Sequence, residues 1–181
     1  MKAIILKEAG GPENLIIKDI PIPVPKKDEV LVKVKAISIN PVDIKTRKGL
    51  SLYNDLKSDQ PVILGWDIAG EVVQVGEDVF TLEEGDEVFG MVNFPGHGKA
   101  YAEYVAAPAS HLAEKPELIT TQEAVAGTLA ALTAWQVLLD EAKLQAGEKV
   151  LIHAAAGGVG GSGLLGSSAI YTQSSAPFCH A

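Results

Sequence analysis

Cysteine is nearly absent from this chain of 181 residues, in which Cys179 is the only one. A single thiol cannot form a disulfide within the chain, and it cannot build a zinc site from several cysteines. Basic residues are in the minority, with 15 Lys and Arg against 23 Asp and Glu, so the formal net charge is −8. A negative charge of this size argues against binding to nucleic acid or to an anionic membrane surface.

Long apolar runs are lacking as well, although 47% of the residues are hydrophobic. No run reaches about 18 residues, the length that a membrane span requires. The first seven residues do not form an apolar core followed by a small-residue cleavage site, so they do not resemble a signal peptide. These absences, together with a lone cysteine that suits a reducing compartment, predict a cytoplasmic protein.

Short β-type segments separated by turn residues fill residues 1–110. The clearest is 29–39, where apolar residues alternate with lysines in the pattern of a half-buried strand. Asn40-Pro41 predicts the start of a short helix that ends by Gly49, because asparagine is a good N-cap and proline suits the first helical position. About six strands and one small helix predict a mainly β, α+β fold, a compact antiparallel barrel.

The sequence changes character near residue 120. Thr120-x-x-Glu123 is a capping-box pattern, and apolar residues follow it at helical spacing, which predicts an amphipathic helix over 121–142. Residues 149–154 (KVLIHA) predict a short apolar strand that runs into a glycine-rich turn. Beyond Gly160 the segment 161–163 has the composition of a spacer, and residues 150–181 contain no Asp, Glu, Lys or Arg.

The glycine-rich turn has the pattern of a phosphate-binding corner. In a dinucleotide-binding fold a strand leads into such a turn, and the N-terminus of the next helix faces the pyrophosphate. Ala154, Gly157 and Gly160 have the spacing A-x-x-G-x-x-G, which is weak evidence by itself because small-residue turns are common. The charged residue expected about 20 positions later, which would read the ribose 2′ position, is absent.

Seven segments, in the same order and spacing, resemble the zinc-free quinone oxidoreductase branch of the medium-chain dehydrogenase/reductase superfamily. They are residues 38–49, 61–70, 71–76, 85–90, 100–105, 132–135 and 154–160. The resemblance implies a GroES-like, partly open barrel over 1–120, and a connecting helix with the first βα corner of an NADP-binding Rossmann domain over 121–160. Residues 161–181 do not match and are interpreted as a Ser/Gly-rich tail, so the Rossmann domain is expected to be truncated.

The resemblance also implies a reaction, in which NADPH delivers a hydride to a quinone or to an α,β-unsaturated carbonyl compound. Such a small molecule would be the partner, and a homodimer the expected assembly. In the zinc-dependent alcohol dehydrogenases of this superfamily a cysteine and a histidine hold the catalytic metal. Asn40 and Trp66 stand at the matching positions, and neither side chain ligates zinc in that way.

Asn40 is the candidate for a group near the nicotinamide and the substrate. Without a metal, negative charge on the substrate oxygen must be met by hydrogen-bond donors or by water. The position of Asn40 before Pro41 is explained equally well by helix capping. Tyr53 is a candidate for lining the substrate cleft, although a loop tyrosine is more often simply packed.

The candidate cofactor-binding residues are, besides Asn40, Thr133 and the glycine-rich turn. The resemblance places Thr133 where the helix reaches the cofactor, although it also reads as an ordinary helix residue. The backbone of the turn would meet the pyrophosphate, through Gly157, Gly158, Val159 and Gly160.

The other polar side chains are interpreted as structural. Asp43 lies in the first turn of the predicted helix, where a negative charge is favourable, and Asp67 is interpreted as a hydrogen-bond acceptor where a strand begins. His97 is expected to be solvated in a flexible loop, whereas His111 and His153 lack spaced partners and are expected to be structural. Cys179 has no partner base in the sequence and is assigned no role.

Two classes of function stay open on the sequence. The first is an NADPH-dependent reductase of the quinone oxidoreductase type. The second is a non-catalytic chain, either a truncated fragment or an isolated GroES-like domain that binds no cofactor. The residues do not distinguish NADPH from NADH, because NADP is implied by the resemblance alone.

Overall fold

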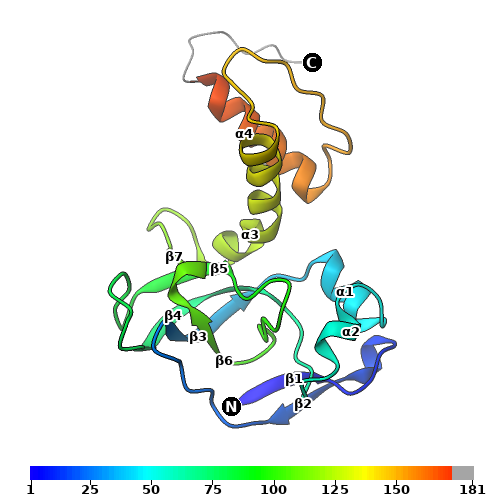
Figure 1. Cartoon of the computed structure of the whole chain (residues 1–181), viewed down its shortest axis with the longest axis vertical. Coiled ribbons are helices and arrows are strands. Elements are labelled where there is room, and N and C mark those ends of the chain that lie inside the picture. Colours follow the sequence, from blue (N-terminus) through cyan, green and yellow to red (C-terminus); the bar gives the residue numbers. More distant parts are fainter. Residues whose placement is uncertain (173–181) are drawn as a thin grey trace. The chain divides into compact units, whose positions relative to one another are not determined.

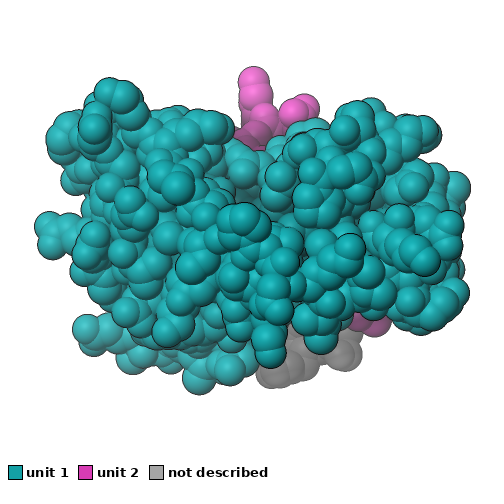
Figure 2. Space-filling view, turned by 90° about the horizontal axis from the view of Figure 1, so that it is seen from below, with its two compact units in different colours: residues 1–126 teal, residues 127–181 magenta. Residues whose placement is uncertain are grey.

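The computed structural model describes residues 1–172, in two compact units divided between Ala126 and Gly127 (Figures 1 and 2). Unit 1 comprises residues 1–126, and unit 2 begins at Gly127. Cys179 lies outside the described residues. Within the described part of the chain, no helix is both long and apolar enough to cross a membrane.

Unit 1 is built from two antiparallel sheets (Figure 1). The small sheet pairs β1 (Lys2–Leu6) with β2 (Leu15–Asp19). The large sheet has the strand order β6-β3-β4-β5-β7, formed by Tyr104–Pro108, Glu29–Ile37, Asp67–Val75, Glu87–Met91 and Ala113–Glu114. Isolated bridges from Ala3 to Ala102 and from Ile5 to Ile63 tie β1 to neighbouring segments. The predicted antiparallel β architecture is therefore confirmed.

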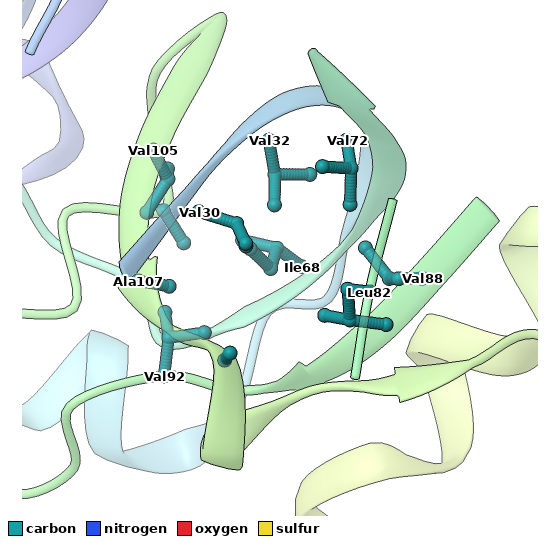
Figure 3. Close-up of a cluster of buried hydrophobic side chains, with 11 residues drawn as sticks. Val30, Val32, Ile68, Val72, Leu82, Val88, Val92, Val105 and Ala107 are labelled. Carbon is teal, nitrogen blue, oxygen red and sulfur yellow. The ribbon is translucent and has the colours of Figure 1, made fainter. Parts of the chain in front are cut away.

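The core of the large sheet follows from the alternation in β3. Val30 and Val32 are fully buried, and Leu31 between them is buried as well, whereas Lys33, the next residue, is exposed. Figure 3 shows these valines pointing toward side chains from the neighbouring strands, among them Val72 and Val88. Removing each such side chain from water stabilises the fold by roughly 1.5–3 kcal/mol. A second core lies beneath the small sheet and contains Trp66.

Two short helices lie between β3 and β4. They are α1 (Pro41–Arg47) and α2 (Tyr53–Leu56), and single 3-10 turns occur at Pro12–Asn14 and Ala109–His111. Asn40 is the N-cap of α1 and forms a capping box with Asp43, with proline at the first helical position. The predicted helix start at Asn40-Pro41 is confirmed.

Helix α3 (Thr121–Trp135) begins where the capping box predicts. The Thr120 backbone N–H donates to Glu123 Oε2 at 2.8 Å, and the Glu123 N–H donates to Thr120 Oγ1 at 3.2 Å. The helix then continues as a π-helical segment, Gln136–Glu141, so the helical path ends one residue before the predicted limit. This wider coil is a local variation on the predicted helix.

The second half of unit 2 differs from the prediction in two respects. Residues 149–154 do not form a strand, because a strand needs a hydrogen-bonded neighbour and every described strand belongs to unit 1. Residues 161–163 do not form a spacer, since they lie inside α4 (Gly158–Thr172). The glycine-rich turn therefore leads into a helix, as expected for a βα corner, but an irregular segment without strand pairing precedes it.

Gly127 in α3 offers a test of helix stability. A Cβ at this position would meet no atom within 4 Å, and glycine in a helix interior costs about 1 kcal/mol relative to alanine. Gly127→Ala is therefore expected to raise the free energy of unfolding by about this amount in urea titrations. Gly70→Ala is the matched opposite, because its Cβ would lie 2.2 Å from the Lys33 carbonyl oxygen. If both substitutions changed the free energy of unfolding equally, the open surroundings of Gly127 and the crowded surroundings of Gly70 would be contradicted.

Candidate functional site

A polar cluster joins the end of β3 to the start of β4 in unit 1. The Ser38 hydroxyl donates to Asp67 Oδ2 at 2.5 Å. The Asn40 amide nitrogen donates to the same carboxylate oxygen at 2.8 Å and to Ser38 Oγ at 3.0 Å. Asp67 is fully buried, and Asn40 is half-buried. The interpretation of Asp67 as a hydrogen-bond acceptor at the start of a strand is confirmed.

Asp43 adds a second buried carboxyl group beside this cluster. Its Oδ2 accepts a hydrogen bond from the Asn40 backbone N–H at 2.6 Å, and the residue is only 2% exposed. Burial raises the pKa of the Asp43 carboxyl from 3.8 to about 6, and the nearby Asp67 charge acts in the same direction. Asp43 is therefore a buried acid, although it also lies in the first turn of a helix, where a negative charge is favourable.

Trp66 packs against the loop 93–98. Its indole N–H donates to the Gly96 carbonyl at 2.7 Å, and its ring meets Phe94 edge-on with the centroids 5.6 Å apart. A Cβ on Gly98 would lie 2.3 Å from the Gly65 carbonyl oxygen, so only glycine allows the loop this close. The loop is thus fixed to the residues that precede β4.

The histidines of unit 1 take part in local contacts. His97 Nδ1 lies 3.7 Å from Asp59 Oδ2, and the His97 side chain is only 27% exposed. The expectation of a solvated His97 is therefore wrong, because the loop packs against its neighbours. His111 Nδ1 accepts a hydrogen bond from the Asn93 backbone N–H at 3.1 Å, as expected of a structural histidine. Within residues 1–172, no three His, Cys, Asp or Glu side chains are arranged to hold a metal ion.

Tyr53 begins α2 and is half-buried against the core that contains Trp66. Part of its ring area is therefore used in packing, which agrees with the structural interpretation of this residue. The rest of the Tyr53 side chain stays exposed and accessible to a ligand. A role of Tyr53 in lining the substrate cleft stays a prediction.

Thr133 and the glycine-rich turn belong to unit 2. The Thr133 hydroxyl donates to the Leu129 carbonyl one turn earlier at 2.8 Å, an ordinary arrangement for a helix threonine. In the turn, the Gly157 N–H donates to the Ala154 carbonyl at 2.9 Å, and α4 starts at Gly158. A Cβ on Gly160 would lie 2.4 Å from the Ala154 oxygen. Close packing of the turn therefore requires glycine at this position.

A cavity of about 490 Å³ lies beside this turn within unit 2. The cavity is lined by side chains from α3, from the π-helical segment and from residues 149–154. They include Ala134, Leu138 and Ile152, together with Gly157 and Gly160. The first N–H groups of a helix have no acceptor inside the helix, and they favour an anion at that end. The residues that line this cavity are mostly apolar, and Gly158 and Val159 at the start of α4 are among them.

The sequence analysis missed the role of Ser38. Ser38 and Asn40 are two residues apart just beyond β3, so in an extended chain their side chains share a face. Because Ile37 pairs with Ile68 in the sheet, Asp67 is brought next to them. Alternation beyond the strand end, combined with the strand pairing, is the signal that identifies this contact.

Comparison with known proteins identifies the family to which the chain belongs. Residues 26–117 match the sequence profile of the alcohol dehydrogenase GroES-like domain. The chain belongs to this family. Among curated relatives, the quinone oxidoreductase of Sus scrofa is 40% identical over 161 residues, which cover 88% of this chain and 47% of that protein. The human quinone oxidoreductase is 37% identical over the same length, with the same coverage.

Solved structures extend the similarity beyond the GroES-like domain. The quinone oxidoreductase of Coxiella burnetii has a TM-score of 0.86 and 40% identity, covering 94% of this chain and 54% of that one. A mycobacterial relative solved in complex with NADPH has a TM-score of 0.79 and 34% identity, covering 94% of this chain and 50% of that one. The chain spans about half the length of the relatives that it matches. The chain therefore has a GroES-like domain of the alcohol dehydrogenase kind and is similar to quinone oxidoreductases over the part that it spans.

Proposed function

We propose that this chain provides the substrate domain and the start of the cofactor domain of an NADPH-dependent oxidoreductase. The reaction is hydride transfer to a quinone or an α,β-unsaturated carbonyl compound, without zinc. The observation that carries the proposal is the likeness to quinone oxidoreductases at 40% identity over 161 residues. The NADPH complex of a 34% identical relative supports the choice of cofactor.

The roles proposed for the residues follow from the family resemblance. Asn40 and Tyr53 serve the substrate side, and Asn40 also contacts the cofactor. Thr133 and the turn serve the cofactor side, where the backbone of Gly157, Gly158, Val159 and Gly160 would hold the pyrophosphate at the N-terminus of α4. NADPH, when bound, supplies the hydride, and the protein contributes binding and orientation.

The donor set supports a zinc-free mechanism. At the positions where zinc-dependent relatives of the superfamily have metal ligands, the Asn40 amide nitrogen donates two hydrogen bonds and the Trp66 indole N–H donates one. Groups that act as donors have no lone pair to offer a metal from the same atom. The chemistry at this site therefore depends on hydrogen bonds and on exclusion of water.

The alternative is a chain that binds no cofactor. It is favoured by the unpaired segment 149–154, because a phosphate-binding turn is normally held by a strand within a sheet. A segment that is not paired in a sheet holds the turn less rigidly, which weakens a site that depends on fixed N–H groups.

Titration of the purified chain with NADPH decides between these functions. Nicotinamide fluorescence reports binding, and addition of 1,4-benzoquinone then reports turnover through loss of that signal. We expect saturable binding followed by oxidation that depends on the protein concentration. Absence of binding at millimolar NADPH would favour the non-catalytic chain.

Gly160→Ala tests the role of the turn. The added Cβ would lie 2.4 Å from the Ala154 carbonyl oxygen, so the turn must open and its N–H groups move. We expect NADPH to bind roughly tenfold more weakly, which corresponds to about 1.4 kcal/mol. Gly161→Ala is the matched control in the same helix, because its Cβ would lie 3.4 Å from the nearest atom, an ordinary contact. Equal affinities of the two variants would argue against a phosphate site at this turn.

A further inference from the structure

The Asn40 side chain has no donor left for a ligand. An amide nitrogen carries two hydrogens, and those of Asn40 are directed at Asp67 Oδ2, 2.8 Å away, and at Ser38 Oγ, 3.0 Å away. The Ser38 hydroxyl is also committed, because its own hydrogen is directed at Asp67 Oδ2. Ser38 and Asn40 thus direct their side-chain hydrogens at one carboxylate oxygen of Asp67, and Asn40 directs its second one at Ser38.

The neighbouring groups also fix the orientation of the amide. Turning it over would place the Asn40 carbonyl oxygen against Asp67 Oδ2, so that two acceptors would face each other at hydrogen-bond distance. The Asn40 backbone cannot readily rotate either, because its N–H donates to Asp43 Oδ2 at 2.6 Å. The Asp43 backbone N–H donates to the Asn40 backbone carbonyl at 3.0 Å and faces the Asn40 side-chain oxygen in the capping box, and that side-chain oxygen has two lone pairs.

We propose that Ser38 and Asp67 are positioning residues that make Asn40 a hydrogen-bond acceptor toward its ligand. The ligand group that Asn40 recognises is then an N–H or O–H donor. The carboxamide NH₂ of a nicotinamide is the donor that suits the proposed function, and this assignment rests on that function. Asn40 consequently binds and orients the ring. On the substrate side its part is to position the reactants, because both of its amide hydrogens are engaged and none is left for a substrate oxygen.

Exchanging the side chains of Asn40 and Asp67 tests the orientation of the Asn40 amide without any ligand. Asn40→Asp places two carboxylates where an N–H···O contact of 2.8 Å now stands, and we expect the melting temperature to fall by about 6 °C. Adding Asp67→Asn restores a donor opposite an acceptor and should recover more than half of this loss. Asn40→Asp with an unchanged melting temperature, or a double variant no better than the sum of the single changes, would overturn the orientation.

A cofactor analogue tests the ligand half of the proposal. In the 3-acetylpyridine analogue of NADPH a methyl group replaces the carboxamide NH₂, so the carbonyl acceptor is kept and the donor is lost. We expect the unchanged chain to bind this analogue roughly tenfold more weakly than NADPH, as for loss of one hydrogen bond to a buried group. In Asn40→Ala the two ligands should bind within about a factor of two of each other.

The two experiments separate this inference from the proposed function. If the unchanged chain binds the analogue as tightly as NADPH, the acceptor role of Asn40 is wrong while the cofactor assignment stands. If the chain binds neither ligand, the proposed function and the cofactor half of the inference both fail. The melting series then still decides whether Ser38 and Asp67 fix the Asn40 amide.

Discussion

Trp66→Ala is expected to lower the free energy of unfolding by about 4 kcal/mol, the usual size for removing a fully buried tryptophan. The side chain is 1% exposed and belongs to the core beneath the small sheet. Its loss leaves a cavity and also removes the hydrogen-bond donor of the Gly96 carbonyl. Urea unfolding followed by circular dichroism measures the change.

Two other tryptophan variants divide this effect into its parts. Trp66→Phe keeps an aromatic ring but loses the N–H···O bond to Gly96, so we expect a smaller loss of about 1 kcal/mol plus a packing cost. Trp135→Ala is the control, because that side chain is 61% exposed, and the change should stay within about 0.5 kcal/mol. A loss in Trp66→Ala no larger than in Trp135→Ala would show that the core does not depend on the indole.

Trp66 also anchors the loop 93–98. Its indole N–H donates to the Gly96 carbonyl, and its ring meets Phe94 edge-on. Packing and one hydrogen bond therefore hold this loop against the residues that precede β4.

Local patterns in the sequence were sufficient to predict most elements of unit 1. The strand β3, the cap at Asn40 and the box from Thr120 to Glu123 each depend on residues a few positions apart, and each is confirmed, although burial in β3 alternates only from Val32 onward. Such features have local causes, because side-chain periodicity and capping act within one element. Together, these local features predict the fold class.

Contacts between distant segments were not predictable in the same way. Ser38 and Asp67 are 29 residues apart, and their contact depends on the pairing of β3 with β4, which contains two register shifts. One extra residue in a strand moves every later side chain to the opposite face, so alternation alone does not give the partner. The strand predicted at 149–154 failed for a related reason, since a suitable sequence does not supply a neighbouring strand.

Asp43 should make the stability of the protein fall as the pH rises from about 4 to about 6. In this range the folded chain keeps the Asp43 proton, because burial raises its pKa from 3.8 to about 6, whereas the unfolded chain has released it. The folded state binds more protons, so stability decreases with pH. The charged group facing Asp43 is the Asp67 carboxyl, and Tyr101 lies within electrostatic range of Asp43. A shift of this size corresponds to about 3 kcal/mol.

Asp43→Asn removes the titration but keeps an oxygen that can accept the Asn40 N–H. We expect its free energy of unfolding in urea to vary less with pH between 4 and 6 than that of the unchanged chain, so that the difference grows in favour of the variant as the pH rises. Glu123→Gln is the control of opposite sign, because hydrogen bonds from Thr120 lower the pKa of Glu123 and its contribution is lost only as the pH falls. Parallel pH curves for Asp43→Asn and the unchanged chain would mean that Asp43 is ionised in the folded protein throughout this range. The two buried carboxylates would then both carry charge beside Asn40.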